Sequence, residues 1–404
     1  MDSNTKPKRL ALVIAHLGPG GAQRVVATAA NAFAEQGIET HVVTILDDPP
    51  DAYKLDPRAI RHWVTSSEKK IEKPTREEGL KSSSALEIPR KAIQKSAFTN
   101  SIQNMVQRPL NAVRFGITLN TRVRSLRRVI RSIKPDAVLS FLTQTNILTI
   151  LATRGLATRT LVSERNDPRL QKTRRRVAVL RKLTYPLADV VTANTYGALQ
   201  AMESFVPKAD LAFLPNPLRL PDSSSPTCSA GPAFITVTRL VEQKGVDILL
   251  KAAAQAFQRL PQWRLAIVGD GPLYAELRLL ASELGIEARV DWHGHVEDPV
   301  ALIRAADVFI LTSRFEGSPN ALLEAMACGL PSIVSNASPG PMELMGPEAG
   351  LIVPAENIGA TARAMITLAQ DREMRERLGA AAFDRTSLHQ LDNAIQVWRE
   401  LLRV

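Results

Sequence analysis

The chain has 404 residues and a formal net charge of +11 at pH 7, with 45% hydrophobic and 23% charged residues. At roughly 150 residues per domain this length suggests two or three domains, and the composition excludes a fibrous or disordered protein. Two cysteines, Cys228 and Cys328, are too few for a disulfide framework, so we predict a cytoplasmic protein. No apolar run reaches the roughly 18 residues of a membrane span, so we expect any membrane contact to be peripheral.

The first half of the chain alternates apolar strands with helices. Residues 10–17 are predicted to form a strand, GPGG at 18–21 a turn, and a helix is expected from about Ala22 to Gly37. Further strands are predicted at residues 39–46, 136–142, 158–164 and 189–194. This alternation favours a parallel α/β domain, which we assign to residues 1–214.

A basic segment interrupts this domain. Sixteen Lys or Arg and five Glu lie between Ser66 and Lys134, so the segment carries an excess of +11, equal to that of the whole chain. A basic amphipathic helix is predicted where apolar residues recur at helical spacing among arginines, at Val123, Leu126, Ile130 and Ile133 among Arg122, Arg124, Arg127, Arg128 and Arg131. A second basic run covers residues 169–182. Either region could be a core-packing helix with a solvated face, or a surface for an anionic membrane or nucleic acid.

Residues 215–232 are rich in Pro and Ser and are interpreted as a linker. After them, strands are predicted at residues 233–240, 264–271, 289–296, 307–313, 330–336 and 350–356, separated by helical stretches. The second half therefore forms a second parallel α/β domain, at residues 233–385, and the chain closes with an amphipathic helix at 386–404.

The stretch SRFEGSPNALLEAMACGLP, residues 313–331, combines two carboxylates with a helix that is otherwise apolar. Ser318 is predicted as its N-cap and Pro319 as its first residue, and Gly329 suits its end. The N-terminus of this helix would point into the crevice at the end of the preceding strand, where free amides favour an anion. A carboxylate at Glu324 would be half-buried, so it requires a hydrogen-bond donor such as a sugar hydroxyl; a structural salt bridge is the alternative.

A second constellation lies in TVTRLVEQKGVDILLKA. Arg239 and Lys244 stand five residues apart across a strand-to-helix turn, and Gly245 permits a close backbone approach. Two cations at the carboxyl end of a strand favour a diphosphate clamp, although either residue alone could belong to an ordinary exposed loop.

On these motifs the chain resembles the retaining glycosyltransferases of family 4. Their GT-B fold consists of two Rossmann-like parallel-sheet domains that face each other across a cleft. The resemblance is carried by TRLVEQKGVDILLKA, IVGDGP, ADVFILTSRFEGSPNALLEAMACGLPSIVS and GLIVPAEN in the second half, and by HLGPGGAQRVVATAANAFAEQGIETHVVT and LPNPL in the first. Residues 66–130 match only loosely. The final helix would pack back on the first domain.

The resemblance implies roles for individual residues. Arg239 and Lys244 would hold the nucleotide diphosphate, Glu316 would contact the donor sugar, and Glu324 would bind the ribose hydroxyls. The backbone would approach the phosphate from both domains: from the second at Gly317 and Ser318, and from the first at Gly20 and Gly21. UDP is the default nucleotide, no cofactor is implied beyond the nucleotide sugar, and the lack of a D-x-D motif argues against a metal ion.

On the acceptor side, FLTQTNIL and VSERNDPR resemble members that extend lipid-linked oligosaccharides for surface polysaccharides. The implied acceptor is a polyprenyl-diphosphate-linked saccharide or another oligosaccharide. Gln144 stands where many members carry a His, Arg165 could hold an acceptor phosphate, and His16, at the end of the first strand, could face the cleft. The basic first domain would then dock on the inner face of the cell membrane.

Other functions remain open. A GT-B epimerase or phosphorylase would share the fold. An NAD-dependent oxidoreductase needs G-x-G-x-x-G, yet Gln23 occupies the third glycine position. A nucleic-acid-binding protein would explain the charge but not Glu316 and Glu324, and 5% aromatic residues offer few stacking platforms. We therefore expect a hexosyl or N-acetylhexosaminyl transferase without a nucleic-acid partner.

Overall fold

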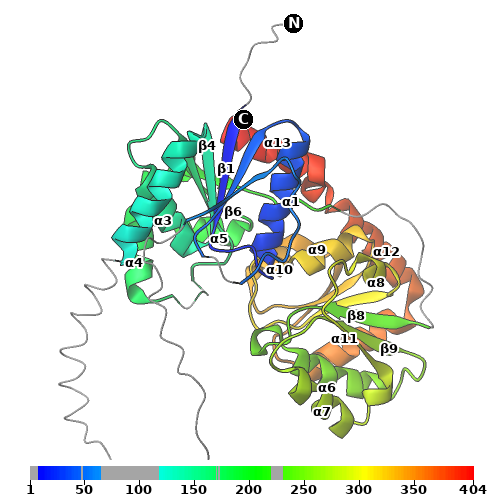
Figure 1. Cartoon of the computed structure of the whole chain (residues 1–404). Coiled ribbons are helices and arrows are strands. Elements are labelled where there is room, and N and C mark those ends of the chain that lie inside the picture. Colours follow the sequence, from blue (N-terminus) through cyan, green and yellow to red (C-terminus); the bar gives the residue numbers. More distant parts are fainter. Residues whose placement is uncertain (1–7, 47–48, 65–117, 170, 172, 220–230) are drawn as a thin grey trace, which may run out of the picture.

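The computed structural model describes residues 8–46, 49–64, 118–169, 171, 173–219 and 231–404, which form two α/β domains (Figure 1). The first domain contains seven parallel strands in the order β3-β2-β1-β4-β5-β6-β7. Their bounds are β1 (Arg9–Ile14), β2 (Glu39–Thr44), β3 (Ile60–Trp63), β4 (Ala137–Phe141), β5 (Arg159–Glu164), β6 (Val190–Ala193) and β7 (Leu211–Phe213). The predicted strands are all present, whereas β3 and β7 were not predicted because such short segments carry no clear alternation.

The second domain has six parallel strands in the order β10-β9-β8-β11-β12-β13. Their bounds are β8 (Ala233–Val237), β9 (Arg264–Val268), β10 (Val290–Gly294), β11 (Val308–Leu311), β12 (Ser332–Ser335) and β13 (Gly350–Val353). Both sheets contain the strand order 3-2-1-4-5-6 of dinucleotide-binding folds. The prediction of two Rossmann-like parallel-sheet domains is therefore confirmed.

Helices connect the strands in both domains. Those of the first domain are α1 (Gly21–Glu35), residues 118–133, α3 (Thr143–Thr153), α4 (Arg175–Thr184) and α5 (Tyr196–Met202). Those that follow are α6 (Val246–Phe257), α7 (Tyr274–Glu283), α8 (Val300–Arg304), α9 (Asn320–Ala327), α10 (Pro339–Met345), α11 (Ile358–Gln370), α12 (Arg372–Asp384) and α13 (Leu391–Leu402). Because the helices cover both faces, the central strands are almost wholly buried, whereas the edge strands β3, β7 and β10 are partly exposed.

The last helix, α13, lies on the first domain, where it contacts α1 and β4 (Figure 1). Its Trp398 is fully buried, packs against Phe33 and Phe141, and donates from Nε1 to the Pro215 carbonyl at 2.9 Å. The chain thus returns to its first domain after completing the second, and the segment around α13 links the two domains.

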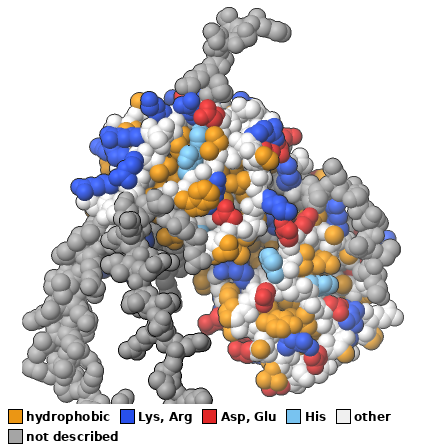
Figure 2. Space-filling view, viewed as in Figure 1, with side chains coloured by type: hydrophobic (Ala, Val, Ile, Leu, Met, Phe, Trp, Pro, Cys, Tyr) orange, Lys and Arg blue, Asp and Glu red, His pale blue; other side chains and the backbone are white. Residues whose placement is uncertain are grey.

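The helix at residues 118–133 includes the predicted basic amphipathic helix. Leu126, Ile130 and Ile133 are buried in the first-domain core, and Arg127 donates to the carbonyls of Ala152 and Arg154 at the end of α3. Four exposed arginines form its outer face: Arg122, Arg124, Arg128 and Arg131. Lys and Arg side chains gather at the outer edge of this domain in Figure 2. The rest of the predicted basic segment, residues 66–117, lies outside the described residues.

Within the ranges given above, no helix is long and apolar enough to cross a lipid bilayer. The exposed apolar side chains are instead scattered over the surface, apart from a group on α4 that is described below.

Candidate active site

Each sheet reverses its strand order at one point, between β1 and β4 in the first domain and between β8 and β11 in the second. Ligands of open parallel sheets bind outside the carboxyl ends of the strands at such a point. The segments that follow these four strands contain the GPGG turn, Gln144, Lys244 and Glu316. The topology therefore collects residues from distant parts of the sequence at the two binding edges.

The two edges meet across the interdomain crevice. Asn320, at the start of α9, donates from Nδ2 to the Gly21 carbonyl at 3.1 Å. Its Oδ1 accepts from Nδ2 of Asn216, in the connecting segment, at 2.7 Å. Gly317 lies directly against the Arg165 carbonyl, where a Cβ would have no room. The structure thus brings the GPGG turn and the EGSPN segment together.

Lys244 and Glu316 form an ion pair at the ends of β8 and β11. Glu316 Oε1 also accepts from Ser313 Oγ at 2.7 Å, and the Glu316 amide donates to Ser338 Oγ at 2.9 Å. The side chain of Glu316 is 9% exposed and that of Lys244 is 16% exposed. The carboxylate is therefore held by two contacts and its backbone by a third, and a phosphate could share the cation beside it.

Arg239 occupies the other end of the predicted clamp. It follows β8, five residues before Lys244, and its side chain is exposed. No hydrogen bond or ion pair to another part of the chain that the structure describes holds its guanidinium. The group is free to turn toward an anion in the crevice.

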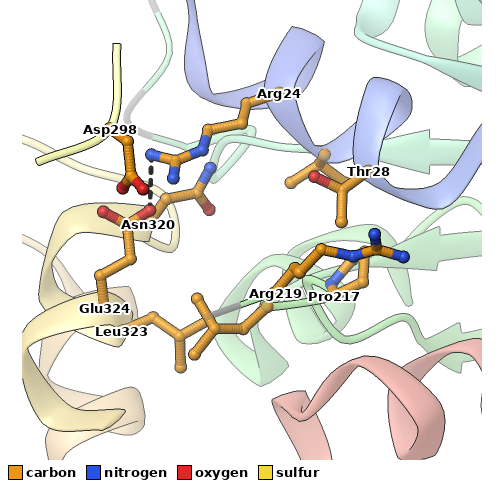
Figure 3. Close-up of a pocket in the computed structure, with 10 residues that line it drawn as sticks. Arg24, Thr28, Pro217, Arg219, Asp298, Asn320, Leu323 and Glu324 are labelled. Atoms are coloured by element: carbon orange, nitrogen blue, oxygen red, sulfur yellow. Dashed lines mark ion pairs between the residues drawn. The ribbon is translucent and has the colours of Figure 1, made fainter. Parts of the chain in front are cut away.

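Glu324, in the second turn of α9, is 2% exposed and borders a cavity of about 250 Å³ between the domains (Figure 3). Its Oε1 forms an ion pair with Arg24 Nη1 of α1 at 2.7 Å, whereas its Oε2 has no hydrogen-bond partner. Burial raises the pKa of this carboxyl to about 7, Arg24 lowers it, and Asp298 in the same cavity raises it further. A buried carboxylate oxygen without a donor is costly, so this oxygen points to a ligand that supplies one.

The start of α9 differs from the prediction by one residue. Pro319 is the N-cap and Asn320 the first helical residue, so Ser318 is not the cap and its side chain makes no capping hydrogen bond. The fixed φ of proline suits the turn into the helix at either position. Gly329 adopts φ +73° directly after the C-cap, as its predicted role at the helix end requires.

Gln144 lies in a second cavity, of about 590 Å³, in the first domain. The cavity is lined by the start of α3 and by the segment that leads into α4, including Thr143, Gln171 and Arg174. Thr143 Oγ1 donates to Oε1 of the fully buried Glu164 at 2.8 Å. The cavity thus offers a guanidinium, amides and hydroxyls, which together suit a polar, partly anionic ligand.

Two other predicted acceptor residues lie elsewhere. Arg165 lines neither cavity: it is 6% exposed and donates to Asn216 Oδ1 and Ser163 Oγ, and burial lowers its pKa to about 9. His16 accepts from the Gly18 amide at Nδ1 (3.1 Å), and its other ring nitrogen faces Gln23. Arg165 is thus engaged with neighbouring side chains, and His16 with the backbone of the turn that follows β1.

Sequence reasoning missed Arg24 and Arg174. Arg24 could have been found as a single charge beside the apolar Val25 and Val26, all on the helix that follows the GPGG turn. Arg174 was included only in the basic run, because nothing in its neighbourhood marks it as facing a cavity. Within the ranges given above, no cluster of three or more His, Cys, Asp or Glu could hold a metal ion.

Comparison with known proteins agrees with this geometry. Residues 20–217 match the family model for the glycosyl transferase 4-like domain, and residues 227–385 match that for glycosyl transferases group 1. A Campylobacter jejuni relative is 25% identical over 401 residues, which cover 94% of this chain and 97% of the relative. It is the N-acetylgalactosamine-N,N'-diacetylbacillosaminyl-diphospho-undecaprenol 4-alpha-N-acetylgalactosaminyltransferase.

Other similarities differ in extent. An exopolysaccharide phosphotransferase from Streptomyces coelicolor is 29% identical over 281 residues, but the chain covers only 29% of that longer protein. The crystal structure of Anabaena HepE in complex with UDP superposes with a TM-score of 0.73 at 17% identity, covering 98% of this chain and 99% of that one. The chain therefore belongs to the glycosyltransferases with the GT-B fold, built from a 4-like domain and a group 1 domain.

Proposed function

We propose that this glycosyltransferase moves a hexosyl or N-acetylhexosaminyl group from a UDP-sugar to a polyprenyl-diphosphate-linked saccharide, with retention of the anomeric configuration. The observation that carries the proposal is the unpartnered Oε2 of Glu324, buried at a cavity between the domains. Ribose hydroxyls are suitable donors for it. The UDP complex of HepE and the lipid-linked substrate in the name of the Campylobacter relative support the choice of donor and acceptor.

On the donor side, Lys244 and Arg239 would hold the diphosphate and stabilise the negative charge that develops as it leaves. Glu316 would bind a hydroxyl of the donor sugar, since Ser313 donates to its carboxylate and its backbone amide donates to Ser338 Oγ, which fixes its position. No metal ion or other cofactor is proposed, so activity is expected to withstand EDTA.

On the acceptor side, we assign the saccharide to the cavity that contains Gln144 and Arg174. Retention is proposed to follow from attack on the face that the diphosphate leaves. A double displacement would need a carboxylate nucleophile next to the sugar. Glu164, next to this cavity, is fully buried and already accepts from Thr143 and Tyr185, so it is not available for that role.

The first experiment is a thermal melt of the purified protein with UDP, GDP, ADP and NAD. A ligand at 100 times its Kd stabilises a protein by about 2.7 kcal/mol. We expect UDP to raise the melting temperature of the wild type but not of Lys244→Ala. Lys251→Ala, in α6, is the matched control and should respond like the wild type. Stabilisation by NAD alone, or by none of the four, would refute the donor assignment.

Transfer itself separates the proposed reaction from those of an epimerase or phosphorylase on the same fold. With a UDP-sugar and a lipid-linked acceptor, we expect UDP release and a product longer by one sugar in equal amounts. Release of an epimerised sugar, or consumption of inorganic phosphate instead of acceptor, would favour one of those two enzymes.

We further propose that the first domain docks on the cytoplasmic leaflet through α4 and the turn that follows it, Tyr185–Leu187. Val179, Leu183 and Leu187 follow each other at intervals of four residues and are 50%, 65% and 44% exposed. Arg174, Arg175 and Lys182 beside them are also exposed. Apolar side chains flanked by basic ones suit an anionic interface, where each basic residue contributes about 1 kcal/mol. Arg174 also lines the acceptor cavity, so docking would bring this cavity to a lipid-borne substrate.

Sedimentation with vesicles of anionic and of neutral lipid tests the docking surface. We expect the wild type to bind anionic vesicles and Leu183→Asp to bind them several-fold more weakly. Leu279→Asp, on α7 of the second domain, removes an equally exposed leucine (61%) and should bind like the wild type. Equal binding of all three proteins, or none by the wild type at physiological salt, would refute this surface.

A further inference from the structure

Arg24 and Glu324 lie 300 residues apart in the sequence and face each other across the interdomain crevice (Figure 3). Arg24 projects from α1, in the first turn after the GPGG segment, and Glu324 from α9. Their ion pair measures 2.7 Å between Nη1 and Oε1, with side-chain exposures of 29% and 2%. Because the two partners belong to different domains, the pair exists only while these domains are in contact.

The charges around Glu324 make Arg24 its main counter-ion. Asp298, in the segment before α8, borders the same cavity and repels the carboxylate, while Arg219 borders it from the connecting segment but pairs with Glu35. Cys328, one turn further along α9, is near Arg304 and faces the same group of charges. Burial and Asp298 both favour the protonated carboxyl, so the charge on Glu324 depends on Arg24.

The protonation state decides what Glu324 can bind. An ionised carboxylate accepts on both oxygens, whereas a protonated carboxyl donates from one of them and loses an acceptor. Arg24 contacts Oε1 and leaves Oε2 without a partner in a residue that borders the cavity, so the two roles do not compete for the same atom. The arrangement leaves one fixed, charged acceptor for a hydroxyl donor.

We propose that Arg24 is a positioning residue of the donor site, contributed by the opposite domain: it orients Glu324 and favours its ionised form, so that the site for the nucleotide ribose is complete only when the domains are closed. This inference rests on the proposed UDP-sugar donor. It extends the donor site from the second domain, which holds Glu324 and Lys244, to α1 of the first.

The test is the Kd of UDP measured by calorimetry between pH 5.5 and 9 for the wild type, Arg24→Ala and Arg24→Lys. Loss of Arg24 should raise the pKa of Glu324, so the midpoint above which UDP binds tightly should move to higher pH. If the midpoint moves up by one pH unit, UDP binds tenfold more weakly at any fixed pH below both midpoints. Arg24→Lys, which keeps the charge, should restore part of the loss.

Two further variants separate positioning from a merely structural role. In Arg24→Ala/Glu324→Gln, the loss should not exceed that of Glu324→Gln alone, because both changes remove the same interaction. Arg9→Ala is the matched control, because Arg9 is 25% exposed and forms an ion pair with Glu39 within the first domain. Its loss should leave the pH midpoint unchanged.

The outcomes are distinguishable. An unchanged midpoint and Kd in Arg24→Ala, with UDP binding to the wild type intact, would overturn this inference alone. Additive losses in the double variant would also overturn it. No UDP binding by the wild type would overturn the proposed donor and, with it, this role of Arg24.

Discussion

Two carboxylates eight residues apart experience opposite environments at the crevice. Glu316 accepts from Ser313 and pairs with Lys244, whereas Glu324 has one paired and one unpaired oxygen and a pKa raised to about 7 by burial. In the folded protein Glu324 therefore binds a proton more tightly than in the unfolded chain. Its contribution to stability is complete below about pH 4.5 and is lost as the pH rises through about 7.

Substitution of Glu324 by Gln should remove this pH dependence. The raised pKa corresponds to a change of roughly 3 kcal/mol in the free energy of unfolding between about pH 4.5 and pH 7. Without nucleotide, we expect the wild type to lose stability from pH 5 to pH 8 relative to Glu324→Gln. The melting temperature of the variant, measured relative to that of the wild type, should therefore rise over this range. Glu316→Gln is the control, since its carboxylate is paired with a cation. Parallel melting profiles for Glu324→Gln and the wild type would contradict the buried-acid interpretation.

At the scale of elements, α13 has the largest single effect expected on the first domain. Trp398 is fully buried against Phe33 and Phe141 and bonds the Pro215 carbonyl. Truncation of a buried aromatic typically costs 3–5 kcal/mol. Trp398→Ala should therefore lower the melting temperature by several degrees. Phe383→Ala, on α12, truncates an aromatic side chain that is 49% exposed and should change the melting temperature little. A comparable loss in both variants would show that α13 does not stabilise the first domain through Trp398.

At the scale of the whole molecule, closure depends on backbone contact between the domains. Gly317 of the second domain lies against the Arg165 carbonyl of the first, and Gly340 lies against Gly317. Nearby, Glu343 of α10 accepts from the amides of Tyr196 and Gly197 at 2.6 and 2.8 Å, at the start of α5. These contacts hold the binding edges of the two sheets together through close packing and hydrogen bonds.

Gly317→Ala should force these edges apart, because the new Cβ meets a backbone carbonyl that cannot move independently. We expect a larger radius of gyration in small-angle X-ray scattering and a loss of transfer activity. Gly359→Ala, in α11, meets only the end of the Arg363 side chain at 3.4 Å and serves as the control. An unchanged radius in Gly317→Ala would mean that the contact adjusts locally and does not set the closure.

Local patterns predicted most of the architecture. The strands of the second domain and the helix that starts near Pro319 are encoded by short-range apolar periodicity and by Pro and Gly at the helix ends, which act within a few residues. The same patterns located Glu316, Arg239 and Lys244 in the segments that follow strands, and Glu324 in the helix that starts near Pro319. They failed for β3 and β7, whose four and three residues are held mainly by pairing with β2 and β6.

The sequence by itself therefore determined the two parallel sheets and which chain segments reach their binding edges, because alternation and strand-end chemistry are local properties. Only the tertiary structure decided which residues meet across the crevice. It paired Arg24 with Glu324 and occupied Arg165 with Asn216. It also placed Arg174 at the cavity that contains Gln144, whereas Arg165 lines neither that cavity nor the one beside Glu324. These contacts join residues up to 300 positions apart, and their energies depend on burial and on the approach of two separately folded domains, which no local pattern records.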